Sequence, residues 1–279
     1  MHIFNGKELA QEILDNLKSA ISSWSKKPRL AVVSLGQESQ SAFIKQKEKA
    51  ANFLACGFKH FNYAADISAA ELRGRLNKIV KSRLNTAVIV QMPLPEHVNS
   101  SILNVIPPEK DPDLLSDRAV GMFFNGRALV EPPTAAAVFR ILESANIDLA
   151  GKKAVVFGWG RLTGRFLAPM FLKRGAAVSV VDEHTGFDAV LEFSRQADII
   201  VSATGQPKLI TAEMIKQGAV VVDAGFSMLD GKIAGDADSE SVKQKAALIT
   251  PVPGGVGPVG VAMLFENVAK LFERFHLIT

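Results

Sequence analysis

Three glycines, Gly158, Gly160 and Gly164, form the pattern G-x-G-x-x-x-G. They follow a short apolar run at 154–157 (AVVF) and precede the helical pattern at 165–175 (RFLAPMFLKRG). Glycines between a strand and a helix let the backbone approach a pyrophosphate at the helix N-terminus. The spacing is one residue longer at its end than the usual dinucleotide fingerprint, and alone it also fits a plain strand-to-helix turn.

An acidic residue follows where a dinucleotide-binding unit has one. A second apolar run, Ala177–Val181, ends in Asp182, and an acid roughly 20 residues past the glycines accepts hydrogen bonds from a ribose 2′-hydroxyl. A carboxylate there also repels a 2′-phosphate. The order of strand, turn, helix, second strand and acid therefore predicts a dinucleotide site that prefers NAD over NADP.

Other polar residues have roles that their spacing leaves open. Lys47 lies four residues after Phe43 on a predicted helix, so both project from one face. Lys45, Lys47 and Lys49 alternate, as lysines on a solvated surface do, and nothing in the spacing singles out Lys47. Gln91 ends an apolar strand, where its amide either caps the local backbone or faces a ligand.

The remaining candidates favour structural roles or exclude other chemistries. Asp111 and Asp113 lie in the turn-forming segment EKDPD, where an Asx turn is the simplest role. The five histidines show no H-E-x-x-H pattern, and Cys56 is the single cysteine, so no metal site is predicted. No G-x-S-x-G motif indicates a serine hydrolase.

Composition bounds the class of protein. The 279 residues, 48% of them hydrophobic, suggest about two domains with sizeable cores. No apolar run reaches the ~18 residues of a membrane span, and the N-terminal residues lack the pattern of a signal peptide. The net charge of +4 comes from interspersed basic and acidic residues, and only 7% are aromatic. We expect a cytoplasmic protein that binds neither nucleic acid nor membrane.

Strands and helices are predicted to alternate along the chain, which favours parallel sheets with helices on both faces. Residues 92–112 are rich in proline and read as loop. In the second half, three apolar segments end in glycine or proline: 197–205, 218–225 and 246–255. The expected helices are 9–21, 41–54, 68–81, 135–145 and 263–275, and the expected strands of the first half are 29–35, 58–64 and 86–91, with a loop at 36–40.

These segments, in this order, resemble the bifunctional methylenetetrahydrofolate dehydrogenase/methenyltetrahydrofolate cyclohydrolase (FolD) family. The segments that carry the resemblance are VQMPLPEH (90–97), KDPD (110–113), ADIIVSATGQP (197–207), IKQGAVVVDAG (215–225), GD (235–236) and ITPVPGGVGPVGVAML (249–264).

The resemblance implies a two-domain α/β fold. Residues 1–136, completed by 262–279, would form an N-terminal αβα domain that binds folate and carries the catalytic residues. Residues 137–261 would form a Rossmann-type NAD(P)-binding domain with a mostly parallel sheet. The C-terminal helix would pack back on the first domain.

The resemblance also implies roles for individual residues. Lys47 would be the catalytic lysine, Gln91 the amide that hydrogen-bonds to it, and Asp113 the carboxylate that holds the pterin ring. A neutral amine could accept a proton from the water that attacks the methenyl carbon, and burial would have to lower its pKa. Phe43 and the loop Pro253, Gly254 and Gly255 would bind substrate. The cofactor would contact Gly158, Trp159, Gly160, Arg161, Gly164, Asp182, Ala203, Thr204 and Gly205.

On the substrate side the sequence departs from the family pattern at several positions, which include Phe43, Pro112 and Leu114. Phe43 stands where the family has a tyrosine, which keeps the ring and removes the hydroxyl, so we expect weakened cyclohydrolase activity. Leu114 stands where the family has a glycine after the second acid of its KDxDG motif. We therefore expect a shifted pterin-side loop.

On the cofactor side, Trp159 and Gly160 replace an Arg-Ser pair whose arginine binds the 2′-phosphate of NADP in many members. Together with Asp182, this favours NAD, although NADP remains an alternative. Arg161 and Arg165 either meet a phosphate or are ordinary surface charges.

The resemblance predicts an oxidoreductase of one-carbon metabolism that oxidises 5,10-methylenetetrahydrofolate to 5,10-methenyltetrahydrofolate with NAD(P), with weakened hydrolysis to 10-formyltetrahydrofolate. Two alternatives stay open: a dehydrogenase of the same architecture acting on another substrate, and a non-catalytic folate- or nucleotide-binding paralogue. A homodimer formed through the nucleotide domain, using the hairpin-like segment 227–233 (SMLDGKI), is also implied.

Overall fold

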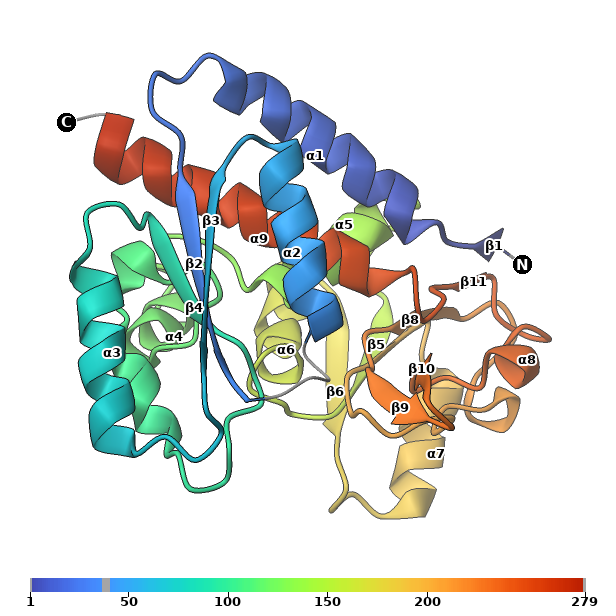
Figure 1. Cartoon of the computed structure of the whole chain (residues 1–279). Helices are drawn as coiled ribbons and strands as arrows, with labels where there is room; N and C mark the ends of the chain where they lie inside the picture. Colours follow the sequence, from blue (N-terminus) through green and yellow to red (C-terminus); the bar gives the residue numbers. More distant parts are fainter. Residues whose placement is uncertain (1, 37–40, 278–279) are drawn as a thin grey trace. The chain divides into compact units, whose positions relative to one another are not determined.

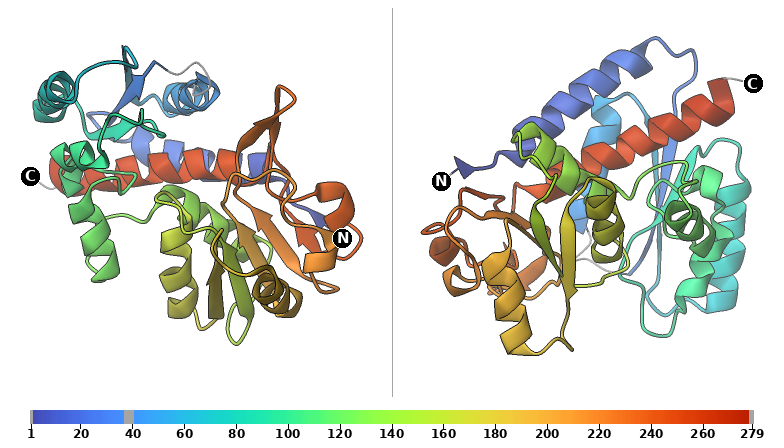
Figure 2. Two further views of the ribbon diagram at one scale, coloured as in Figure 1. Left: turned by 90° about the horizontal axis from the view of Figure 1, so that it is seen from below. Right: turned by 180° about the vertical axis from the view of Figure 1, so that it is seen from behind.

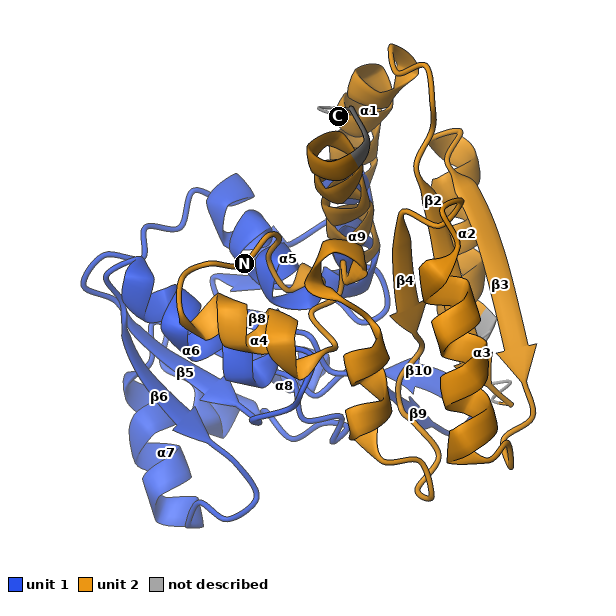
Figure 3. Ribbon diagram, turned by 90° about the vertical axis from the view of Figure 1, so that its left-hand side faces the viewer, with its two compact units in different colours: residues 1–10, 134–260 blue, residues 11–133, 261–279 orange. Residues whose placement is uncertain are grey.

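The computed structural model describes residues 2–36 and 41–277 (Figure 1). Most of the loop predicted at 36–40 therefore lies outside the described residues. The chain divides into two compact units (Figure 3), which are described separately. Unit 1 contains Met1–Ala10 and Thr134–Gly260, and unit 2 contains Gln11–Pro133 and Val261–Thr279.

Unit 2 contains a parallel three-stranded sheet. Its strands lie in the order β3 (Gly57–Tyr63), β2 (Arg29–Leu35) and β4 (Ala87–Val90). The central strand β2 is buried from Leu30 onward, as its apolar sequence predicts. Right-handed crossovers are the rule for such parallel connections, and the connecting helices here are α2 (Ser41–Phe53) and α3 (Ala69–Lys81).

Short helices occupy the proline-rich part of unit 2. They are η2 (Ser100–Val105), η3 (Pro108–Lys110) and α4 (Asp117–Phe124), followed by the chain's passage into unit 1. The sequence pattern did not indicate α4. Its N-cap is Ser116, whose hydroxyl accepts a hydrogen bond from the backbone N–H of Ala119.

Two long helices contribute to both units: α1 (Gly6–Ser22) and α9 (Val256–Phe272), which runs on into a π-helical turn, η5 (Glu273–Leu277). Within unit 2, the Trp24 ring that follows α1 stacks on Phe272 of α9, with centroids 5.4 Å apart. Helix α9 begins seven residues before the predicted start at 263. Pro258 lies in its first turn, where a helix needs no N–H donor.

Unit 1 is built on a six-stranded parallel sheet that confirms the predicted Rossmann-type fold. From β5, the chain first adds β6 on one side and then β7 on the other, so the strand order reverses between β5 and β7. An antiparallel hairpin, β9 (Ser227–Leu229) and β10 (Lys232–Ala234), confirms the hairpin-like reading of 227–233. The sheet order is β1 (His2–Ile3), β11 (Leu248–Ile249), β8 (Val220–Asp223), β7 (Ile199–Ser202), β5 (Lys153–Phe157) and β6 (Ala177–Val181).

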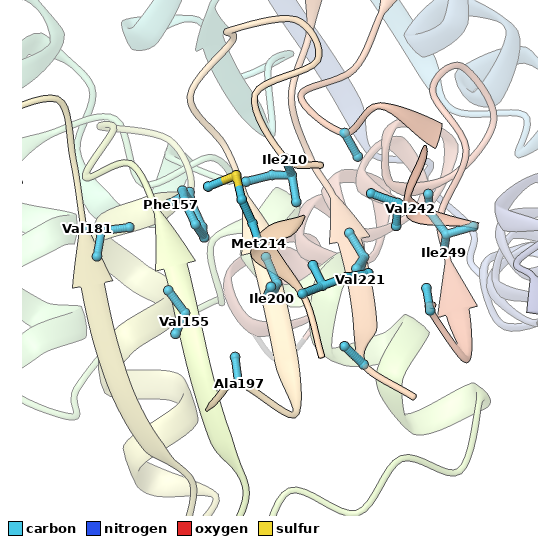
Figure 4. Close-up of a cluster of buried hydrophobic side chains, with 14 residues drawn as sticks. Val155, Phe157, Val181, Ala197, Ile200, Ile210, Met214, Val221, Val242 and Ile249 are labelled. Carbon is cyan, nitrogen blue, oxygen red and sulfur yellow. The ribbon is translucent and has the colours of Figure 1, made fainter. Parts of the chain in front are cut away.

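Helices cover both faces of this sheet, and Figure 2 shows α6 and α7 on opposite sides of β5 and β6. On the α7 face, alternate residues such as Val155, Phe157, Ile200 and Val221 form one buried cluster (Figure 4). The intervening residues, such as Val156 and Val201, are also buried, and burial of both faces explains why the strands read as continuous apolar runs. The other elements of unit 1 are α5 (Pro133–Ser144), α6 (Gly164–Lys173), α7 (Phe187–Gln196), η4 (Ala212–Met214) and α8 (Ser239–Val242).

Candidate active site

Unit 2 pairs a lysine with an amide at the end of its sheet. Lys47, on α2, donates a hydrogen bond from Nζ to Oε1 of Gln91 at 2.6 Å. Gln91 directly follows β4, and its backbone N–H donates to the carbonyl of Val33 at 2.8 Å. This bond continues the hydrogen-bond ladder between β4 and β2 and fixes the backbone that carries the side-chain amide. Lys45 and Lys49 are exposed, as a solvated surface predicts, whereas Lys47 is half-buried. The solvated-surface interpretation is therefore wrong for Lys47 alone.

A carboxyl group influences the lysine electrostatically. Burial lowers the pKa of Lys47 below that of an ordinary lysine, and the charge of Asp113 opposes this shift only in part. Burial raises the pKa of Asp113 to about 7, the charge of Lys47 opposes the rise, and Asp111 adds to it. Both shifts favour the uncharged form, so the site favours a neutral amine that can accept a proton.

The loop that carries Asp113 is held by its neighbours. Asp111 is fully buried and accepts hydrogen bonds from the backbone N–H of Leu115 at 2.9 Å and from both the N–H and hydroxyl of Ser116, at 2.8 and 2.7 Å. The turn role proposed for Asp111 is thus confirmed. Lys110 donates from Nζ to the carbonyls of Val80, 2.8 Å, and Ser82, 2.9 Å, which ties the loop to the C-terminal end of α3.

Two features of this loop carry no local sequence signal. Leu114 adopts the left-handed conformation, with φ +49°, that glycine favours, and its side chain is 2% exposed. Asn267, on α9, donates from Nδ2 to the carbonyls of Pro112 at 2.9 Å and Glu131 at 2.6 Å. Sequence reasoning missed Asn267 because its partners lie more than a hundred residues away in the chain.

Unit 1 brings the glycine pattern together with two later segments. The N–H of Gly158 donates to the carbonyl of Val181 at 2.8 Å, so Asp182 lies beside the first glycine. A Cβ on Gly158, whose φ is +93°, would lie 3.0 Å from the carbonyl oxygen of Ala203. A Cβ on Gly164 would lie 2.0 Å from the carbonyl oxygen of Gly158. This cluster lies where the strand order reverses, which is where open α/β sheets bind ligands.

The geometry of this turn fits a dinucleotide. At Gly160 the nearest atom to an added Cβ is 3.9 Å away, so the backbone is open beside the N-terminal end of α6. Asp182 is exposed, and its Oδ1 accepts hydrogen bonds from the N–H of His184, 3.0 Å, and the hydroxyl of Thr185, 3.2 Å, which fix the carboxylate. The Trp159 side chain is 52% exposed.

The other predicted cofactor and substrate residues are distributed over both units. Arg161 and Arg165 are half-buried, and the guanidinium of Arg165 lies 4.8 Å from the centroid of the Phe166 ring. Thr204 and Gly205 follow β7 directly after Ala203. Phe43 lies one turn before Lys47 on α2 in unit 2.

The predicted substrate loop of Pro253, Gly254 and Gly255 belongs to unit 1 and connects β11 to α9. A Cβ on Gly6, at the start of α1, would lie 2.0 Å from the carbonyl oxygen of Gly255. The loop therefore packs directly on the beginning of α1. Gly254 has φ +109°, a conformation that only glycine adopts readily.

Within residues 2–36 and 41–277, no cluster of three or more His, Cys, Asp or Glu side chains could hold a metal ion. In the same described ranges, no helix is both long enough and apolar enough to traverse a lipid bilayer.

Comparison with known proteins extends this description over nearly the whole chain. Residues 4–113 match the family model of the tetrahydrofolate dehydrogenase/cyclohydrolase catalytic domain, and residues 132–276 match that of the family's NAD(P)-binding domain. The bifunctional protein FolD of Lactobacillus delbrueckii subsp. bulgaricus is 37% identical over an alignment of 279 residues, which covers 98% of this chain and 98% of that protein.

Solved structures agree. The Trypanosoma brucei methylenetetrahydrofolate dehydrogenase-cyclohydrolase, solved with NADP and an inhibitor, has a TM-score of 0.93 at 31% identity and covers 98% of this chain and 97% of its own. The FolD of Campylobacter jejuni has a TM-score of 0.91 at 35% identity and covers 99% of this chain and 100% of its own.

Fold and site define a two-unit α/β protein in which a Rossmann-type unit accompanies a unit with a half-buried lysine, amide and carboxyl. The chain belongs to the tetrahydrofolate dehydrogenase/cyclohydrolase family. The resemblance found in its sequence is thereby confirmed.

Proposed function

We propose that this protein oxidises 5,10-methylenetetrahydrofolate to 5,10-methenyltetrahydrofolate with NAD(P) and hydrolyses the methenyl compound to 10-formyltetrahydrofolate. Family membership over both units supports the pair of activities. The observation that carries the proposal in this chain is the 2.6 Å hydrogen bond between Lys47 and Gln91, on a lysine whose pKa is lowered by burial.

In the hydrolytic half, Lys47 acts as general base. The methenyl carbon is cationic, so water attacks it and must lose a proton as the new C–O bond forms. A neutral amine accepts that proton, and burial, which lowers the pKa of Lys47, favours the neutral form. Gln91 receives one N–H of the amine and so fixes its orientation. Phe43, one turn earlier on the same helix, supplies a ring without a hydroxyl, which weakens this half-reaction.

Asp113 is proposed to hold the pterin ring in unit 2. Its position depends on the buried Asp111 turn and on the bond from Asn267 to the carbonyl of Pro112, directly before it. In the oxidative half, bound NAD(P) supplies the nicotinamide that accepts the hydride. No residue has to remove a proton for that step, so the role of the chain is to orient the two molecules.

For the nucleotide, we propose a preference for NAD. The carboxylate of Asp182, fixed beside Gly158, repels a 2′-phosphate and accepts hydrogen bonds from a 2′-hydroxyl. Trp159 offers no positive charge at the turn. The Trypanosoma brucei relative holds NADP, so the preference must be measured as the ratio of kcat/KM for the two nucleotides. Asp182→Ala should lower the ratio of kcat/KM for NAD to kcat/KM for NADP. An unchanged ratio contradicts the role assigned to Asp182.

A spectrophotometric assay tests the whole proposal. Methylenetetrahydrofolate is mixed with each nucleotide, and absorbance is followed at the wavelengths of the reduced nucleotide and of the methenyl product. Signals at both are expected. Folate binding without any reduced nucleotide would support the non-catalytic alternative, whereas reduction only with another substrate would support the alternative dehydrogenase.

We further propose a homodimer that uses the β9–β10 hairpin of unit 1. Met228 is 55% exposed and Leu229 37% exposed on this two-stranded element. Such apolar side chains on an exposed hairpin favour association. Sedimentation equilibrium should show a dimer, and Met228→Asp should shift it toward monomer; a monomeric parent protein contradicts the proposal.

A further inference from the structure

Asp236 is a fully buried carboxyl to which neither the family resemblance nor the mechanism above assigns a role. It lies between β10 and α8 in unit 1. Its Oδ2 accepts three hydrogen bonds, from the hydroxyl of Ser202 at 2.7 Å, the backbone N–H of Thr204 at 2.7 Å and the hydroxyl of Thr204 at 2.9 Å. All three donors belong to the end of β7 and the segment that follows it.

Two glycines leave room for two buried carboxyls: Gly225 for that of Asp236 and Gly235 for that of Asp223. A Cβ on Gly225 would lie 2.1 Å from Oδ1 of Asp236, and a Cβ on Gly235 would lie 2.2 Å from Oδ2 of Asp223. Asp223 in turn accepts hydrogen bonds from the N–H groups of Gly225, 2.8 Å, Asp236, 3.1 Å, and Ala237, 2.8 Å. Asp223 therefore fixes the backbone that carries Asp236.

The segment held by Asp236 touches the glycine turn. The hydroxyl of Thr204 accepts a hydrogen bond from the N–H of Gln206 at 3.1 Å, so the same contact orders two further residues. The carbonyl oxygen of Ala203 lies at the limit of contact, 3.0 Å, from the position of a Cβ on Gly158. A small movement of Ala203 would thus either close on the turn or open a gap beside it.

Burying a carboxyl is costly unless hydrogen bonds compensate it. For Oδ2 the compensation comes from a segment that ends at the ligand-binding edge of the sheet, whereas the buried Oδ1 has no hydrogen-bond partner among the described residues. We propose that Asp236 is a positioning residue for the dinucleotide, because it fixes the position of residues 202–204 relative to the turn at Gly158. This inference rests on the cofactor site proposed above and extends it to a residue outside the turn.

The test compares Asp236→Ala and Asp236→Asn by calorimetric titration of the purified protein with NAD and, separately, with a folate. The alanine removes all three acceptor contacts, and the dissociation constant for NAD should rise by about tenfold, the equivalent of one net hydrogen bond. The asparagine can still present one carbonyl oxygen to the same donors, so its effect should be smaller. Folate affinity should stay within about twofold, because neither Ser202 nor Thr204, whose groups donate to Asp236, is among the residues assigned to folate.

A matched control lies at the opposite end of the same strand. Asp198, just before β7, accepts from the N–H of Lys153 at 2.8 Å and pairs with Lys216 at 2.5 Å. Asp198→Asn disturbs β7 where no ligand is expected, so it should lower the melting temperature without raising the dissociation constant for NAD.

In steady-state kinetics, Asp236→Ala should raise KM for NAD more than it lowers kcat.

A second variant guards against failure of the alanine to fold. Gly225→Ala keeps every donor and acceptor but forces the Asp236 carboxyl to move, and Gly225 does not have the positive φ that would make alanine strained for another reason. Ser202→Ala removes a single donor. Both should weaken NAD binding in the same direction as Asp236→Ala, with the smaller effect for Ser202→Ala.

The outcomes separate this inference from the proposed function. If the parent protein binds neither NAD nor NADP, the proposed cofactor site itself is wrong. If the parent binds NAD and the Asp236 and Gly225 variants bind it equally well, or if Asp198→Asn weakens binding as much as they do, Asp236 has only a general structural role and the inference is overturned.

Discussion

Lys47→Met removes the proposed general base and changes little else. Methionine is apolar and nearly as long as lysine, so it fills the half-buried position. The variant loses the 2.6 Å bond to Gln91, worth about 1 kcal/mol net. It also removes the cost of burying an amine, which is the cause of the lowered pKa. These terms oppose each other, so the free energy of unfolding should change by less than about 1 kcal/mol.

The effect on hydrolysis should be far larger. General-base catalysis contributes about 10²–10⁴ in rate, equivalent to about 3–5 kcal/mol in the barrier to water attack. Hydride transfer needs no protein base, so its kcat should fall by no more than about threefold, the loss expected from a small change in substrate orientation. A single substitution should therefore separate the two activities.

The assay follows loss of methenyltetrahydrofolate absorbance for hydrolysis and formation of reduced nucleotide for oxidation, with the same protein preparation. Lys49→Met is the matched control, because Lys49 lies on the same helix and is exposed. It should leave both rates unchanged. If Lys47→Met hydrolyses the methenyl compound at the parent rate, or if both activities collapse together in a folded variant, the role assigned to Lys47 is wrong.

Three further predictions follow from the same unit. Hydrolysis should rise with pH and level off below the pH of about 10.4 at which an ordinary lysine titrates, since only unprotonated Lys47 accepts a proton and burial lowers its pKa; a pH–rate profile that keeps rising to that pH contradicts this. Asn267→Asp cannot donate to the carbonyl of Pro112, directly before Asp113, or to that of Glu131, so KM for the folate should rise by about tenfold with KM for NAD unchanged; the exposed Lys270→Ala on the same helix is the control, and equal KM values in both variants refute the coupling. Leu114→Gly relieves about 1 kcal/mol of left-handed strain but gives up about 2–3 kcal/mol of side-chain burial, so the melting temperature should fall by a few degrees in a thermal melt, and a rise would reverse this balance.

Elements with a strong local pattern could be predicted from the sequence almost residue by residue. The strands at Arg29–Leu35 and Ala177–Val181 have the predicted bounds, and Ser68, the first residue of the helix predicted at 68–81, is the N-cap of α3. Buried parallel strands read as continuous apolar runs, and a cap residue acts on the next three residues, so both signals lie in a short window. The glycine spacing was equally local, and so is the close approach of Gly164 to Gly158, whereas the contact of Gly158 with Ala203 is not.

Patterns that mix signals were harder to interpret. Helix α9 begins among glycines and prolines that read as loop, and α4 is too short to show a clear period. Leu114 adopts a conformation that its residue type disfavours, since tertiary burial outweighs the strain. The sequence predicted a shifted loop there but could not show which conformation it takes.

By itself, the sequence determined the alternation of strands and helices, the turn that suits a dinucleotide, and the family. The pairing of Lys47 with Gln91 followed from the family resemblance and not from the spacing of the residues. Tertiary structure alone decided how deeply each of the three alternating lysines is buried, and that Asn267 and Asp236 hold loops far away in the chain. Backbone periodicity depends on neighbours within a few residues, whereas the pKa and orientation of a side chain depend on groups that only folding brings beside it.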